Sequence, residues 1–198
     1  MAQASIGYID QSARSNWMRL RTLVFVRWFA ISGQIVTLIV AQYLYGLKLA
    51  LVPCAIIIGM SVLTNIFALI VFPDNRRLSE TETVFTLLFD TLQLSLLLAF
   101  TGGLSNPFAL LILAPVTIAA TVLPTRSTLF LAVCSVVMIT IVSLIHLPLK
   151  TATRNLMDMP DVFLFGFWVA IVTGIIFISV YTRRVTAEMT SMSEALLA

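Results

Sequence analysis

Residues 49–72 read LALVPCAIIIGMSVLTNIFALIVF and contain no charged side chain. A helix needs about 20 mostly apolar residues to cross the hydrocarbon core of a bilayer, so this stretch is predicted to be a transmembrane helix. Five further apolar stretches lie at 23–45, 84–100, 108–123, 129–147 and 162–181. The stretches at 84–100 and 108–123 are short, so we expect them to cross steeply or to be extended at the interface.

The composition of the whole chain agrees with a membrane protein. Hydrophobic residues make up 60% and charged residues 11%, with a mean hydropathy of +1.03. A soluble domain carries about 25% charged residues. Backbone groups in lipid must be hydrogen-bonded internally, which favours helices. We therefore predict an all-α integral membrane bundle of six transmembrane helices over 23–181, preceded by a cytoplasmic segment at 1–22.

The basic residues indicate the orientation of the predicted spans. Nine lie on one side and three on the other: Arg14, Arg19, Arg21, Arg27, Arg76, Arg77, Arg126, Arg183 and Arg184 against Lys48, Lys150 and Arg154. Cytoplasmic loops carry the excess of Lys and Arg, so both termini are predicted to be cytoplasmic. The basic residues are scattered along membrane boundaries, which argues against a nucleic-acid partner.

A different pattern follows the last span. Val185, Met189, Met192 and Leu196 recur at spacings of 4, 3 and 4 residues, which is typical of a coiled-coil seam. We predict that the sixth helix continues into the cytoplasm, that 182–198 begins a coiled-coil linker, and that two copies pair as a homodimer. The alternative is an amphipathic helix that lies on the membrane surface.

The loop between the third and fourth spans, 102–108, reads GGLSNPF and is uncharged. Glycines let a ligand approach the main chain, Ser105 and Asn106 offer hydrogen bonds, and Phe108 offers a face for stacking. These features suit a quinone, which has a flat ring and two carbonyl oxygens. A structural interpretation is equally open, because Ser105 or Asn106 can cap a helix that begins at Pro107.

GGLSNPF fits the GGxxNPF signature of RegB/PrrB-type (ActS-like) redox-sensing histidine kinases, and the six-span layout is similar as well. In that family the loop is implicated in binding ubiquinone, which regulates autophosphorylation. The resemblance implies this role for Gly102, Gly103, Asn106, Pro107 and Phe108, with Leu104 and Ser105 at the variable positions.

The resemblance also implies the setting of the chain. It would be the sensor domain of a two-component kinase in the bacterial inner membrane. The kinase core and its response regulator would lie outside this chain, so we assign no catalytic residue. A different class of function is a small multi-span transporter or membrane scaffold subunit with the loop as a structural turn.

Other polar residues lie inside or near the spans. His146 is predicted at about the depth of the loop, where it would hydrogen-bond a quinone carbonyl or simply reach the interface. Cys54 and Cys134 form no metal-ligand spacing, so no metal site is predicted.

Helical rise predicts two polar pairs between spans. Asp90 and Arg27 lie at similar depth, so we expect an ion pair supported by Asn65. Gln34 and Gln93 match one layer deeper, and amide pairs hold spans together. A protonation switch at Asp90 is the alternative to this structural role.

Overall fold

The computed structural model describes residues 20–72, 78–149 and 159–197, and within these ranges every element is helical. The elements are α2 (Leu20–Ile39), the π-helical η1 (Val40–Leu44), α3 (Leu51–Val71), α4 (Glu80–Phe100), the 3-10 turns η2 (Gly103–Ser105) and η3 (Pro107–Ile112), α5 (Leu113–Val122), α6 (Thr125–Leu144) and α7 (Asp161–Leu197). The predicted all-α membrane bundle is confirmed. Residues 1–19 of the predicted N-terminal segment lie outside the described ranges.

Five helices are long and apolar enough to cross a membrane: Leu20–Leu44, Leu51–Val71, Glu80–Phe100, Thr125–Leu144 and Asp161–Thr182. The third span is extended at the interface, which is one of the two expectations for the short 84–100 stretch. Helix α4 begins at Glu80 because Ser79 caps it. The Ser79 side chain accepts from Glu82 N, and a Glu82 carboxylate oxygen accepts from Ser79 N at 2.9 Å. This capping box satisfies two backbone N–H groups that the first turn leaves free.

The fourth apolar segment, Pro107–Val122, is shorter than the others. Its first six residues form η3 and the next ten form α5. A 3-10 helix rises about 2.0 Å per residue and an α-helix about 1.5 Å, so the segment is about 27 Å long rather than about 24 Å. The 3-10 start therefore brings this short stretch close to the hydrocarbon thickness of about 30 Å.

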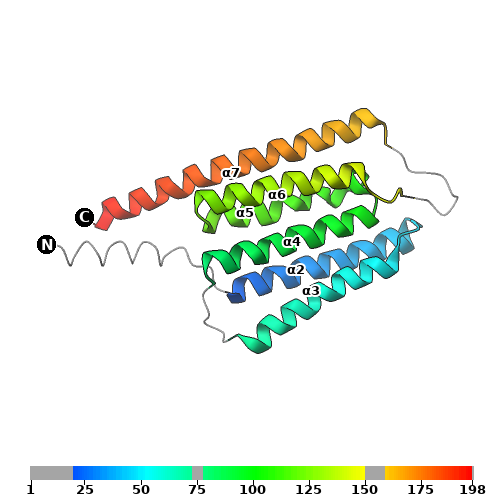
Figure 1. Ribbon diagram of the computed structural model, residues 1–198, viewed down its shortest axis with the longest axis horizontal. Helices are drawn as coiled ribbons and strands as arrows, with labels where there is room; N and C mark the ends of the chain where they lie inside the picture. Colours follow the sequence, from blue (N-terminus) through cyan, green and yellow to red (C-terminus); the bar gives the residue numbers. More distant parts are fainter. Residues whose placement is uncertain (1–19, 73–77, 150–158, 198) are drawn as a thin grey trace.

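Helix α4 lies in the middle of the bundle (Figure 1), with α2 and α3 on one side and α5, α6 and α7 on the other. One apolar core gathers around Leu98, Ile112, Ile139, Ile171 and Ile175, which join α4, η3, α6 and α7. Two further clusters join α2 to its neighbours. The outer surface carries large exposed apolar side chains, including Phe25, Phe29, Ile70 and Val162, as lipid contact requires.

Helix α7 continues well past the span. Its 37 residues correspond to a length of about 55 Å, compared with a hydrocarbon core of about 30 Å. The helix extends beyond its neighbours at the end that carries the C-terminus (Figure 1). The predicted helical continuation over 182–197 is thus present, and its pairing with a second copy stays a prediction.

Candidate ligand cavity between α2, α4 and α5

A cavity of about 470 Å³ lies between α2, α4 and the η3–α5 segment. This volume is within the range of about 300–1,000 Å³ that is usual for small-molecule sites. Its wall is mostly apolar and includes Leu94, Leu97 and Leu98 of α4. The polar side chains on the wall are Arg27, Gln34, Thr37, Ser61, Asp90, Gln93, Thr101 and Asn106. One cavity therefore joins the 102–108 loop to the polar residues inside the spans.

The loop contributes two of its predicted ligand residues to this wall, Asn106 and Phe108. Phe108 is 41% exposed and lines the cavity. Residues 102–105 and 107 are not on the wall. Two of the seven motif residues thus line the cavity, and the other five do not.

The glycines of the motif face the segment that follows α6. Gly102 and Gly103 have φ values of 102° and 57°, in the left-handed region that favours glycine. A Cβ on Gly103 would lie 2.6 Å from His146 Cγ, and one on Gly102 would collide with the Leu149 side chain. The Leu147 N–H donates to the Ala99 carbonyl at 2.8 Å. The glycines therefore allow residues 145–149 to pack against the loop, and neither glycine lines the cavity.

Asn106 is the N-cap of η3. Its Oδ1 accepts from the Phe108 N–H at 2.9 Å, and its Nδ2 donates to Thr101 Oγ1 at 2.8 Å and to the Thr101 carbonyl at 3.3 Å. Pro107 occupies the first helical position, where a missing N–H costs nothing. The capping interpretation of the motif is therefore present in the structure, and the polar atoms of Asn106 are used inside the loop.

His146 lies beside the loop, at the depth that the sequence indicated. Its ring packs on Gly103, and its Nδ1 is 3.1 Å from the Val142 carbonyl oxygen. The side chain is half-buried and does not line the cavity. The geometry thus gives His146 a packing role against the motif.

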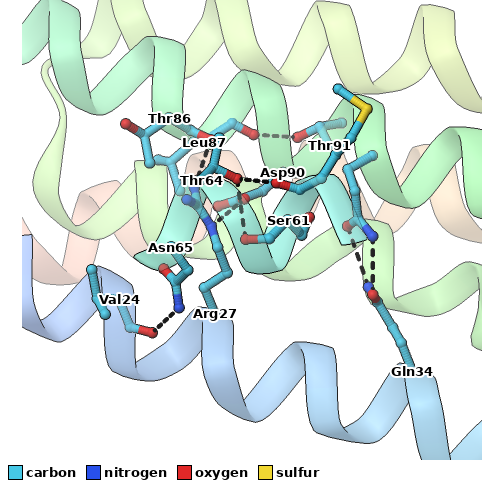
Figure 2. A network of polar contacts seen from close by, with 12 residues as sticks. Val24, Arg27, Gln34, Ser61, Thr64, Asn65, Thr86, Leu87, Asp90 and Thr91 are labelled. Atoms are coloured by element: carbon cyan, nitrogen blue, oxygen red, sulfur yellow. Dashed lines mark hydrogen bonds and ion pairs between the residues drawn. The ribbon is translucent and has the colours of Figure 1, made fainter. Parts of the chain in front are cut away.

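The predicted ion pair is present deeper in the bundle. Arg27 Nε lies 2.7 Å from Asp90 Oδ1 (Figure 2), without the alignment of a hydrogen bond. Arg27 Nη2 donates to the Thr86 carbonyl at 3.5 Å, and the guanidinium lies 5.5 Å from the centre of the Phe89 ring. The pair joins α2 to α4 on the wall of the cavity.

Asn65 does not support this ion pair as expected. Its Nδ2 donates to the Val24 carbonyl at 3.1 Å, and the side chain is fully buried. Asn65 therefore joins α3 to α2, one turn before Arg27 (Figure 2). The sequence predicted that these residues lie at a similar depth in the membrane. The Asn65 side chain, however, points from α3 to the Val24 carbonyl and not to the ion pair.

Gln34 and Gln93 form a reciprocal amide pair (Figure 2). Gln34 Nε2 donates to Gln93 Oε1 at 3.3 Å, and Gln93 Nε2 donates to Gln34 Oε1 at 3.0 Å. Both side chains line the cavity. The pair is a second polar link between α2 and α4.

Sequence reasoning missed Thr101. Its hydroxyl accepts from Asn106, donates to the Leu97 carbonyl at 2.8 Å, and lines the cavity. A hydroxyl directly before the two glycines, at the end of an apolar run, is the signal that would have identified it.

The fold and cavity define a multi-pass helical membrane domain. Residues 10–155 match the family model described as the PilS-like transmembrane domain, a six-span domain, and the chain belongs to that family. Two curated relatives are each called sensor histidine kinase RegB, one from Cereibacter sphaeroides and one from a named strain of that species. Each is 47% identical over 192 residues, which is 97% of this chain and 42% of the relative.

The chain thus spans less than half the length of these relatives. No solved structure matches it. The matches confirm the resemblance inferred from GGLSNPF and support a sensor-kinase transmembrane domain.

Proposed function

We propose that this domain binds ubiquinone in the cavity beside the GGLSNPF loop and thereby controls autophosphorylation by a kinase core. The observation that carries the proposal is the presence of Asn106 and Phe108 on the wall of one apolar cavity of about 470 Å³. A flat ring with a long apolar tail matches such a wall, and an exposed aromatic ring offers a stacking surface. The name of the relatives, sensor histidine kinase, supports the link to a kinase.

The packing suggests how occupancy would reach the kinase. The cavity is bounded by α5 residues, and α5 packs directly against α7. Leu113 of α5 is close to Gly174, at which an added Cβ would lie 3.4 Å from the leucine side chain. A ligand shifts such an equilibrium only if it binds two packing states with different affinity. We propose that ubiquinone does so, and that the change passes through α5 to the α7 extension.

The rest of the setting belongs to the same proposal. The protein would lie in the bacterial inner membrane with both termini in the cytoplasm, would pair as a homodimer, and would pass phosphate to a response regulator. The excess of basic residues on one side of the spans supports this orientation.

A binding titration tests the proposal. The purified domain in nanodiscs is titrated with ubiquinone-1, as wild type, Phe108→Ala and Phe163→Ala. Phe163 is an exposed phenylalanine on α7 that does not line the cavity, so it is the matched control. We expect Phe108→Ala to weaken binding by about tenfold, from lost apolar contact between the aromatic ring and the ligand, and Phe163→Ala to bind like wild type.

A wild-type domain that binds no quinone would contradict the proposal. In that case the hydrogen bonds of Asn106 would favour the second candidate, a membrane scaffold or transporter subunit in which the loop is a structural turn.

A further inference from the structure

We propose that the quinone head is held at the Gln34–Gln93 pair deep in the cavity, and that the loop contacts the remainder of the ligand. This inference rests on the proposed function and assigns the hydrogen-bonding partners within it. It differs from a head held by the loop, because the two positions are separated along α4. Gln93 precedes the end of α4 at Phe100 by about 10 Å of helical rise.

The two polar side chains at the loop end of the cavity wall, Thr101 and Asn106, already have hydrogen-bond partners. The Asn106 Nδ2 donates to the hydroxyl and to the carbonyl oxygen of Thr101, and the Asn106 Oδ1 accepts from the Phe108 backbone. The Thr101 hydroxyl donates its single proton to the Leu97 carbonyl. A quinone carbonyl is an acceptor, so it needs a donor that these two side chains do not have free.

The glutamine pair, in contrast, retains hydrogen-bond donors. A primary amide has two N–H groups and an oxygen with two lone pairs. The reciprocal pair uses one N–H and one lone pair on each side chain. In the described part of the chain neither side chain has a further hydrogen-bond partner, so each amide keeps one N–H for a ligand. Both amides line the cavity.

The cavity wall around the glutamine pair is mostly apolar. Leu94 and Leu97 flank Gln93 on the wall, and Ala30 and Ile31 lie near Gln34. Apolar walls exclude water, and a hydrogen bond in a low-dielectric site is stronger than one in water. Asp90 lies one turn before Gln93. Its ion pair with Arg27 therefore forms the part of the cavity wall that is next to the amides and farther from the loop. An apolar ring with two carbonyl oxygens matches an apolar wall that carries two amide groups.

The test combines affinity with a vibrational signature. Ubiquinone-1 labelled with ¹³C at its carbonyls is bound to wild type, Gln93→Leu, Gln34→Leu, Phe108→Ala and Gln42→Leu. Gln42 is the matched control, because it bonds the Leu49 backbone at 3.2 Å and does not line the cavity. We expect each of the first two variants to weaken binding by about tenfold. We also expect the carbonyl band of the bound quinone to move to higher frequency in them, because hydrogen bonding lowers this frequency.

The spectrum separates a ligand contact from a structural effect. We expect Phe108→Ala to weaken binding and Gln42→Leu to bind like wild type, both with the wild-type carbonyl frequency. If wild type binds quinone and neither glutamine variant moves the band, the inference is overturned while the proposed function stands. If wild type binds no quinone, both fail together.

A measurement on the wild-type protein covers the case in which the glutamine variants do not fold. The side-chain amide resonances of ¹⁵N-glutamine-labelled protein are recorded with and without ubiquinone-1. Chemical-shift changes at Gln34 and Gln93, with Gln42 unchanged, support the inference. Equal or absent changes at all three overturn it.

Discussion

Arg27 and Asp90 are two charged side chains that the bundle holds within its spans. A single charge at the centre of a membrane helix costs about 2.5–3.5 kcal/mol by insertion scales. Their 2.7 Å contact, together with the Thr86 carbonyl and the Phe89 ring, compensates part of this cost. The side chains are 11% and 23% exposed, so neither is surrounded by solvent. Removing one charge of such a pair therefore lowers the stability of the domain more than removing both charges.

This asymmetry predicts the outcome of a double-mutant cycle. Asp90→Leu leaves the Arg27 charge without a partner, and we expect it to destabilise the domain by about 3 kcal/mol. The double variant Arg27→Met/Asp90→Leu removes both charges, so we expect it to be more stable than Asp90→Leu alone. Unfolding by denaturing detergent, followed by circular dichroism, measures both. Additive losses from the two single substitutions would contradict this interpretation.

The glycines of the loop act through backbone conformation and close packing. Gly103 has φ 57°, and an added methyl group would lie 2.6 Å from the His146 ring. We expect Gly103→Ala to destabilise the domain by about 1–2 kcal/mol, from the left-handed conformation alone. Gly59→Ala is the control, because Gly59 lies within α3 with no atom within 4 Å of an added Cβ. Thermal unfolding compares the two, and equal midpoints would show that the loop accommodates a side chain.

The helices show which elements hydrophobicity can locate. Five apolar stretches gave helices close to the predicted ranges, because length and composition decide whether a segment lies in lipid. The first residue of α4 was not predicted, because its Ser79–Glu82 capping box lies in a polar stretch and hydropathy does not detect helix caps. The 3-10 conformation of η3 was not predicted either. It arises where Asn106 and Pro107 fix the chain direction at the end of α4.

The link between Asn106 and Thr101 predicts that η3 depends on the end of α4. Thr101→Val removes an acceptor of the Asn106 amide, and we expect a loss of about 1 kcal/mol in stability. Thr117→Val is the matched control, since Thr117 is exposed on α5 and its hydroxyl bonds only the Leu113 carbonyl of its own helix. Chemical unfolding of the two variants measures the difference. A loss as large in Thr117→Val would indicate a general effect of valine in these helices.

At the scale of the whole molecule, the sequence predicted the members of the site but not their assembly. The loop and the pairs Arg27–Asp90 and Gln34–Gln93 were separate hypotheses, because depth along a span says nothing about which face a residue occupies. The structure brings them to one cavity because α4 lies between α2 and α5 and carries Asp90, Gln93 and Thr101 along one side. Only the position of α2 beside α4, linked to it by these side-chain pairs, reveals that relation.

The extension of α7 leads to a prediction for the assembled protein. The spacing of Val185, Met189, Met192 and Leu196 predicts a seam between two copies. Met192 is 69% exposed in the single chain, as an unpartnered seam residue should be. We expect Met192→Cys to form disulfide-linked dimers in native membranes at several times the yield of Glu188→Cys. Glu188 is exposed on the same helix but outside the seam, and at such positions the sulfurs of two paired helices are too far apart for a bond of about 2 Å. Equal yields would place α7 on the membrane surface or alone in the cytoplasm, and would remove the dimer from the signalling route proposed for α5 and α7.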